Sequence, residues 1–232
     1  MENKTVVIII PALNEEKSIG SVLSKIPRQY AKHIFVIDSL SSDKTPEIAK
    51  RFGASVIANK IPTYDAACFL GAKHADFADI LVFLQAGGDD EPEDIQKLLQ
   101  PLFTKKADMV MGARTLKDDQ DPPLLWHQTV GTKIVVTLIN MIFLTNFRDI
   151  GPFRAIRYDA YRRLSMKPKK FSWTTQMLIK ALKLHMRVVE IPVHTKKRIG
   201  KSKIAGSIYY SFLAMRDMFW SFKFVFSIKN TK

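Results

Sequence analysis

The chain has 232 residues, 47% of them hydrophobic, so it can bury one sizeable core with a helical appendage. Its net charge is +14, and its single cysteine, Cys68, excludes an internal disulfide and fits a reducing compartment. No charge-free apolar run is long enough to span a bilayer, and the first residues lack a signal-peptide layout, so we expect a cytoplasmic protein.

The positive charge is concentrated in the second part of the chain. Residues 151–232 contain 19 Lys and Arg against 3 acids, whereas residues 1–150 contain 17 against 19. Such asymmetry indicates a polyanionic partner, either nucleic acid or an anionic membrane surface. No recognised nucleic-acid motif accompanies the charge, so nucleic acid is the weaker alternative. We therefore expect a protein that lies peripherally at the inner face of a membrane.

The first half of the sequence alternates between two kinds of apolar pattern. Near-continuous apolar runs predict strands at residues 5–10, 33–38, 54–58, 79–84 and 107–113. Helical spacing predicts helices between them at residues 15–26, 43–52, 65–75 and 91–103. Apolar strands that alternate with helices are typical of a mainly parallel sheet covered on both faces, which places the chain in the α/β class.

The pattern changes beyond residue 114. The sequence predicts an exposed loop at 118–123, helices at 126–147 and 173–184, strands at 149–157 and 187–193, and a basic loop at 196–207. The tail aligns six apolar side chains on one helix face: Ile208, Phe212, Met215, Phe219, Phe222 and Phe226. Such a helix either lies in a membrane interface or docks on the protein's own core. We favour the interface, and so divide the chain into a main domain, 1–206, and a C-terminal helix, 207–232.

Polar residues follow the predicted strands, where ligands bind in parallel sheets. They stand at residues 14–16, 38–43 and 85–94. No G-x-G-x-x-G follows the first strand, and no P-loop is present, which excludes both common nucleotide-binding motifs. A phosphate site here would therefore depend on a bridging cation or on basic side chains.

Six segments resemble, in order, the motifs of family 2 glycosyltransferases with the GT-A fold. They are "IIIPALNEE", "VIDSLSSDKT", "DILVFLQAGGDDEPEDI", "DIGPFRAIR", "FSWTTQM" and "RIGKSKIAG". The similarity runs from about residue 6 to residue 206 and is greatest to the dolichyl- or polyprenyl-phosphate mannosyl- and glucosyltransferases. It implies a GT-A fold and inverting transfer of a sugar from a nucleotide-sugar to a polyprenyl-phosphate-like acceptor.

The resemblance also implies roles for individual residues. Those that would hold the donor base and ribose are Pro11, Leu13, Glu15 and Asp38, and the Asp-x-Asp metal motif aligns with Gln85, Ala86 and Gly87. Those in motifs that face the phosphates are Arg114, Arg154, Arg198 and Lys203. The planar fork of arginine suits this task because it donates two hydrogen bonds to phosphate. Arg154 and Gln176 fall at the positions that the resemblance makes catalytic.

Five departures from the family pattern fall in these same motifs. Gln85 and Gly87 replace both acids of Asp-x-Asp, Ser39 replaces the second acid after Asp38, Asp65 replaces a glycine, and Gln176 replaces an acid. Mg²⁺ and Mn²⁺ bind carboxylate oxygens, so the loss of two acids removes the charge that would hold the ion. Gln176 cannot act as a general base. That loss matters little if the acceptor is a polyprenyl phosphate, because this nucleophile is already an anion and needs no base.

The loop that follows contains a group of acids whose role has two alternatives. Asp89, Asp90 and Glu91 either hold a displaced Mg²⁺ or Mn²⁺, or cap the helix that begins at Pro92. Acids favour a first helical turn, so we expect capping. The chain would then be a metal-independent transferase whose Arg and Lys residues neutralise the diphosphate, or an inactive relative that binds or scaffolds. A positive φ at Gly87 would oppose an aspartate there.

Overall fold

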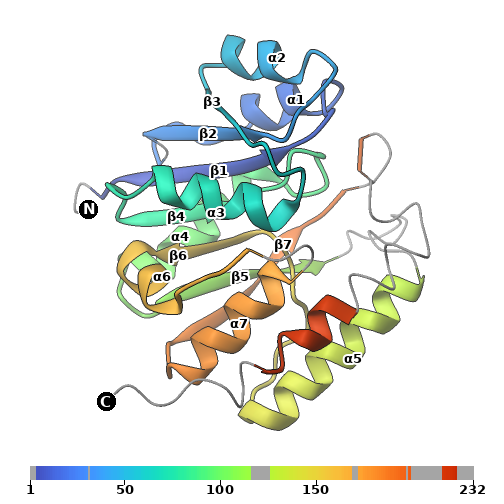
Figure 1. Cartoon of the computed structure of the whole chain (residues 1–232). Helices are drawn as coiled ribbons and strands as arrows, with labels where there is room; N and C mark the ends of the chain where they lie inside the picture. The colour runs from blue at the N-terminus through green and yellow to red at the C-terminus, as the bar shows by residue number, and fades with distance from the viewer. Residues whose placement is uncertain are drawn as a thin grey trace.

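A single seven-stranded sheet forms the centre of the molecule (Figure 1). The computed structural model describes residues 4–30, 32–115, 126–168, 172–196, 198–199 and 216–223. The strands are β1 (Val6–Ala12), β2 (His33–Asp38), β3 (Ser55–Ala58), β4 (Ile80–Phe83), β5 (Met109–Thr115), β6 (Arg154–Arg157) and β7 (Val188–His194). Their order in the sheet is β3-β2-β1-β4-β6-β5-β7. All neighbouring pairs are parallel except those that include β6.

Helices cover both faces of this sheet, as the apolar strands predict (Figure 1). They are α1 (Ile19–Ser24), α2 (Thr45–Arg51), α3 (Tyr64–His74), the 3₁₀ helix η1 (Pro92–Asp94), α4 (Ile95–Phe103), α5 (Trp126–Phe143), α6 (Tyr158–Leu164) and α7 (Trp173–Lys183). Successive side chains of β1 point to opposite faces. Val7 and Ile9 pack in the core with α3, α5, α6 and α7, whereas Val6, Ile8 and Ile10 pack with α1, α2 and α4. Both faces of the sheet are therefore buried.

The structure confirms the α/β class and corrects several boundaries. The predicted helix 15–26 is reduced to α1, because the Glu15 carbonyl closes a tight turn on Ser18 and Ile19 before the helix begins. The predicted helix 126–147 ends at Phe143, where Leu144 adopts a positive φ of 53°. Helix α6 was not predicted, because its seven residues are too few for a periodic signal.

The predicted C-terminal helix, 207–232, lies mostly outside the described residues, as do Ile208, Phe212, Met215 and Phe226 of its predicted apolar face. Within 216–223, Met218 and Phe222 pack against the core cluster, and Phe219 is exposed. This described part lies beside α5 in Figure 1. In the part of the chain that the structure describes, no helix has the length and hydropathy needed to cross a bilayer.

Candidate active site

Polar and charged side chains gather at the carboxyl ends of β1, β2 and β4. The chain lays β2 and β3 on one side of β1 and β4 on the other, so the strand order reverses between β1 and β4. A sheet opens a crevice at such a reversal, and ligands bind there. The loops after these strands bring Glu15, Asp38 and Gln85 to the same edge. The sequence prediction that these residues share one edge is confirmed.

The loop after β4 is bound along its length to the segment that follows β7. The Lys196 amide donates to the Asp89 carbonyl at 2.8 Å, and the Ile199 amide donates to the Gly87 carbonyl at 3.0 Å. An antiparallel bridge joins Asp90 to Thr195. These backbone contacts therefore hold Thr195, Lys196 and Ile199 against the loop after β4.

Arg198 lies directly over Gly87. A β-carbon built on Gly87 would stand 2.4 Å from Cζ of Arg198 and 2.5 Å from Nη1. The backbone of Gly87 does not have the positive φ that would itself require glycine, whereas Gly88 has a φ of +77°. The backbone at position 87 therefore does not itself oppose an aspartate, and the atoms that a side chain there would meet belong to the Arg198 guanidinium.

The carboxylates around Arg198 bind it from two chain segments. Nη2 of Arg198 donates to Oε1 of Glu15, and Nη1 lies 3.7 Å from Oδ1 of Asp89. The other oxygen of Asp89 accepts a hydrogen bond from Nε2 of Gln85 at 3.0 Å. One guanidinium thus joins the loop after β1 to the loop after β4.

The remaining acids of the loop do not cap the helix, which corrects the expectation. Neither η1 nor α4 has a side-chain cap. The Glu91 carboxylate forms ion pairs with Lys25, at 3.1 Å, and with Lys196. Burial alone would raise the pKa of Glu91, but hydrogen bonds with Glu93, Lys196 and Lys25 lower it to about 2. Burial, reinforced by the neighbouring Asp89, raises the pKa of Asp90 to about 8.

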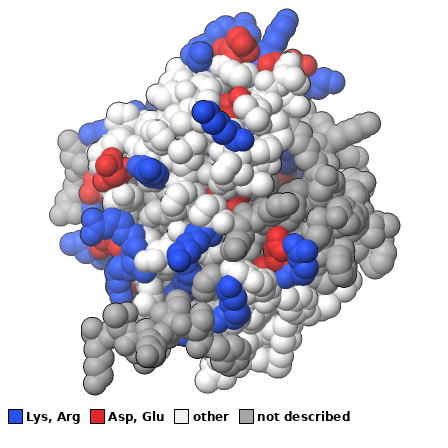
Figure 2. Space-filling model, in the orientation of Figure 1, with Lys and Arg blue, Asp and Glu red and all other residues white. Residues whose placement is uncertain are grey.

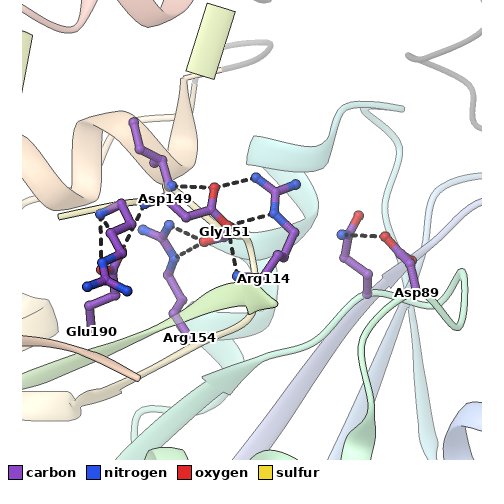
Figure 3. A network of polar contacts seen from close by, with 9 residues as sticks. Asp89, Arg114, Asp149, Gly151, Arg154 and Glu190 are labelled. Carbon is purple, nitrogen blue, oxygen red and sulfur yellow. Dashed lines mark hydrogen bonds and ion pairs between the residues drawn. The ribbon is translucent and has the colours of Figure 1, made fainter. Parts of the chain in front are cut away.

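A second polar network lies at the ends of β5 and β6 (Figure 3). Asp149 accepts two hydrogen bonds from the Arg114 guanidinium, at 2.7 Å from Nε and 2.5 Å from Nη2, and one from the Arg114 amide at 3.1 Å. Glu190 of β7 accepts from the backbone amides of Arg148 and Asp149. The charge of Arg114 is therefore matched by a carboxylate, and the segment before β6 is anchored to two strands.

Arg154, in the same network, has no such match. Its side chain is 0% exposed, and it stands opposite Phe83, at the carboxyl end of β4. Nε and Nη2 donate to the Gly151 carbonyl, and Nη1 donates to the Thr174 carbonyl at 2.9 Å. Within the described part of the chain, none of its hydrogen bonds goes to a carboxylate. Burial lowers the pKa of Arg154 to about 10, so it stays charged at neutral pH.

Gln176 is buried, and both polar atoms of its side chain are occupied. Its Oε1 accepts from the Lys167 amide and its Nε2 donates to the Lys167 carbonyl, both at 3.1 Å. Its assignment to catalysis therefore rests on the motif alone. Asp65 is also buried, and it accepts hydrogen bonds from the amide and hydroxyl of Ser172, so this departure joins α3 to the start of α7.

The other predicted donor residues lie at the expected edge. Pro11 and Leu13 are half-buried at the end of β1, Ala86 is buried, and Asp38 is buried with Oδ1 lacking a hydrogen-bond partner. Lys203 lies outside the described residues. The predicted roles of these residues stay predictions.

The residues at the loop after β4 do not fit a divalent cation. Gly87 has no side-chain ligand, Asp89 is engaged by Gln85 and Arg198, and the guanidinium fills the space over Gly87. Among the residues that the structure describes, no three His, Cys, Asp or Glu side chains are grouped so that they could hold a metal ion. The predicted metal ligands Asp89 and Asp90 are thus adjacent but lack a third acidic partner.

Basic side chains gather on the lower part of the face shown in Figure 2. Arg162 and Arg163 in the last turn of α6 are exposed, and Lys183 in the last turn of α7 is half-buried, whereas Lys180 is buried and donates to the Ser165 carbonyl. The charge asymmetry of the sequence therefore becomes a basic region on the surface.

Sequence reasoning missed three residues that organise the site. Asp149 pairs with Arg114, Glu190 accepts from the Asp149 amide, and Lys196 pairs with Glu91. Asp149 is the first residue of the segment "DIGPFRAIR". An acid directly before a predicted strand could have indicated a partner for a nearby arginine. Glu190 is an acid inside an apolar strand, and such a residue usually needs a buried partner.

Comparisons with known proteins agree with this geometry. The model of Glycosyl transferase family 2 matches residues 7–165. An uncharacterised glycosyltransferase of Mycobacterium tuberculosis is 33% identical over 221 residues, which cover 95% of this chain and 98% of the relative.

Two relatives have more specific names. The UDP-N-acetylglucosamine–dolichyl-phosphate N-acetylglucosaminyltransferase of Methanococcus voltae is 28% identical, covering 84% of this chain and 87% of its own. The undecaprenyl-phosphate mannosyltransferase of Micrococcus luteus is 27% identical, covering 88% of each chain.

Among solved structures, the fold is similar to that of glucosyl-3-phosphoglycerate synthase from Mycobacterium tuberculosis, in complex with Mn²⁺, UDP and glucosyl-3-phosphoglycerate. The TM-score is 0.76 at 18% identity, over 99% of this chain and 82% of that one. This likeness confirms the predicted GT-A fold.

Proposed function

This chain belongs to glycosyl transferase family 2, and from that premise we propose that it transfers a sugar from a nucleoside-diphosphate sugar to a polyprenyl-phosphate-like lipid. A phosphate oxygen of the lipid attacks the anomeric carbon, the bond from that carbon to the donor diphosphate breaks, and the nucleoside diphosphate leaves. The relatives whose names include dolichyl phosphate and undecaprenyl phosphate support this acceptor class.

The observation that carries the proposal is the buried guanidinium of Arg154. It is held by the carbonyls of Gly151 and Thr174 at the carboxyl edge of the sheet, without a carboxylate. A buried charge without a hydrogen-bonded carboxylate is costly, so an anion that enters the site is favoured. The phosphate of the acceptor is such an anion, and two of the guanidinium's five N–H donors remain for it.

The replacement of an acid by Gln176 agrees with a phosphate acceptor. An alcohol nucleophile needs a base to remove its proton, whereas a phosphate is ionised at neutral pH. Oε1 of Gln176 accepts from the Lys167 amide and one N–H of Nε2 donates to the Lys167 carbonyl, and a neutral amide cannot act as a base. The chemistry then depends on orientation and on positive charge around both phosphates.

The acceptor's lipid nature requires a membrane surface, which we assign to α5. This helix exposes Val130, Ile134, Met141 and Ile142 by 48%, 43%, 61% and 44%, and Leu144 just beyond it by 91%. An apolar helix face with basic residues around it lies in the interface of an anionic bilayer. The basic ends of α6 and α7 supply that charge (Figure 2).

The test is transfer of label from UDP- and GDP-sugars, labelled in the sugar, to undecaprenyl phosphate in mixed vesicles. We expect label in the lipid extract with the phosphate and none with undecaprenol, the matched alcohol. Label on undecaprenol would contradict the role given to the phosphate. Nucleotide binding without transfer from any donor would support the rival function, an inactive relative that binds or scaffolds.

A further inference from the structure

Gly87 and Arg198 form a matched pair at the place where the family pattern has its second metal-binding acid. With the Arg198 guanidinium in its observed place, only glycine fits at position 87, because a β-carbon there would stand 2.4 Å from Cζ and 2.8 Å from Nε of Arg198. Real β-carbons do not approach other atoms so closely, so a larger residue would displace the guanidinium. The loss of the acid and the position of the arginine are therefore one structural feature.

The position of Arg198 is set by backbone contacts on both of its sides. Lys196 donates to the Asp89 carbonyl, and Ile199 donates to the Gly87 carbonyl. The side chain of Ile199 then covers Gly88, where a β-carbon would lie 3.3 Å from Cδ1 of Ile199. The Arg198 side chain, between these anchors, points across Gly87 toward Glu15.

The local charges are consistent with a substitution of one cation for another. In the family motif, the charges of the two aspartates balance the charge of the divalent ion. In this chain, Gln85 and Gly87 stand at those two positions and carry no charge that an ion would balance. Arg198 then supplies a positive charge that is held by Glu15 and lies 3.7 Å from Asp89. A guanidinium carries its charge at all accessible pH values and binds phosphate oxygens through two parallel donors.

Arg198 retains hydrogen-bonding capacity for a ligand. Its side chain is 23% exposed, and its Nε is buried without a hydrogen-bond partner. Glu15 accepts a hydrogen bond from Nη2, and Asp89 faces Nη1. The guanidinium is therefore oriented before any ligand binds. Preorganised donors of this kind bind an anion at low entropic cost.

We infer that Arg198, seated over Gly87, is the fixed cation of the donor site and binds the diphosphate of a nucleotide in place of a divalent metal ion. The inference rests on the proposed function, because it presupposes a nucleotide donor. It adds that donor binding by this chain is independent of metal.

The first experiment is calorimetric titration of the full chain with UDP and with GDP, in EDTA and in Mn²⁺. We expect the Kd of the nucleotide that binds to agree within about twofold between the two buffers. Mn²⁺-induced tightening of about tenfold or more would overturn the inference and leave the proposed function intact. Absence of binding in both buffers would overturn both.

The second experiment is a double-mutant cycle in EDTA. Arg198→Ala should weaken nucleotide binding by about tenfold or more, since a charge-assisted hydrogen bond is lost. Gly87→Ala adds one methyl group and no charge, and should weaken binding about fivefold by displacing the guanidinium. The double variant should bind as Arg198→Ala does, because Gly87 acts through Arg198. An additional fivefold loss in the double variant would overturn the pairing.

The matched control is Arg187→Ala. Arg187 is an exposed arginine paired with Asp108 just before β7, whereas Arg198 follows the other end of that strand. Its removal changes the net charge equally and should leave the nucleotide Kd unchanged, so an equal loss would overturn a local role for Arg198. Thermal melting and Arg198→Gln, which keeps polarity and bulk, separate loss of binding from loss of the fold.

Discussion

Two arginines of the site, the buried Arg154 and the half-buried Arg198, are bound in opposite ways. Arg198 is held by carboxylates from two loops, Glu15 and Asp89, and part of its side chain reaches the surface. Arg154 is wholly buried and is held by backbone carbonyls. Carboxylates orient a cation and reduce its net charge, whereas carbonyls orient it and leave the full charge.

This difference teaches which ligand each position suits. A paired arginine can exchange one partner for a phosphate at modest cost, as a site that binds and releases a nucleotide requires. An unpaired buried arginine gains most from an anion, and a reacting phosphate there is stabilised in low dielectric. We therefore propose that the donor binds at Arg198 and the acceptor phosphate at Arg154.

The largest expected effect comes from removing the unpaired charge. Arg154→Gln should lower sugar transfer to undecaprenyl phosphate by about 10³-fold, comparable to the loss of one preorganised donor in other active sites. Nucleotide affinity should change little, because the donor is assigned to Arg198. The measurement is transfer rate together with calorimetric Kd for UDP or GDP.

The converse variant makes this prediction decisive. Arg198→Ala should weaken nucleotide binding, so that transfer recovers when the donor concentration is raised. Arg154→Gln should not recover in this way. If both variants lose nucleotide affinity equally, the division between donor and acceptor is wrong.

Much of this arrangement could be predicted from the sequence, because it depends on patterns within short segments. The apolar runs of β1, β2 and β4 fixed the α/β class and the edge at which Glu15, Asp38 and Gln85 meet. The motif "DIGPFRAIR" led to Arg154, although its burial and its carbonyl partners follow from the pairing of β6 with β4 and β5.

The rest depended on contacts between distant segments. Arg198 meets Gly87 because the segment after β7 pairs with the loop after β4, and no local pattern in either segment encodes that pairing. The same cause misled the capping prediction, since Glu91 is drawn to Lys25 and Lys196. Acids near a helix start favour capping only when no cation from elsewhere competes for them.

A second prediction turns a paired arginine into an unpaired one. Asp149→Asn removes the counter-charge of Arg114, whose ion pair is largely buried. Breaking such a pair should cost about 2–4 kcal/mol in the free energy of unfolding at pH 7, because it leaves a buried charge. Chemical denaturation of the two proteins measures the difference.

The pH dependence of that difference follows from Asp149. Burial alone would raise the pKa of Asp149, but the hydrogen bonds and charge of Arg114 hold it below its ordinary value. The stabilisation by the carboxylate is therefore complete above its unfolded pKa of about 4 and is lost as the pH falls through the lower folded value. The two proteins should differ equally at pH 7 and pH 5, and they should converge only as the pH falls through the lowered folded pKa of Asp149. A difference that shrinks between pH 7 and pH 5 would exclude Asp149 as its source.

The smallest expected effect concerns how the lipid reaches the Arg154 side of the site. Helix α5 leads directly into the segment that carries Asp149 and Gly151, so its exposed apolar face belongs to that side. Replacing Ile134 and Met141 together by serine removes two side chains that would enter the bilayer interface. We expect the fraction of protein bound to anionic vesicles to fall about three- to tenfold, while the nucleotide Kd stays unchanged.

The matched control is Phe77→Ser, which removes a 51% exposed aromatic ring beside His33, at the start of β2. Sedimentation with vesicles compares the three proteins, and equal sedimentation would place the lipid surface elsewhere than on α5.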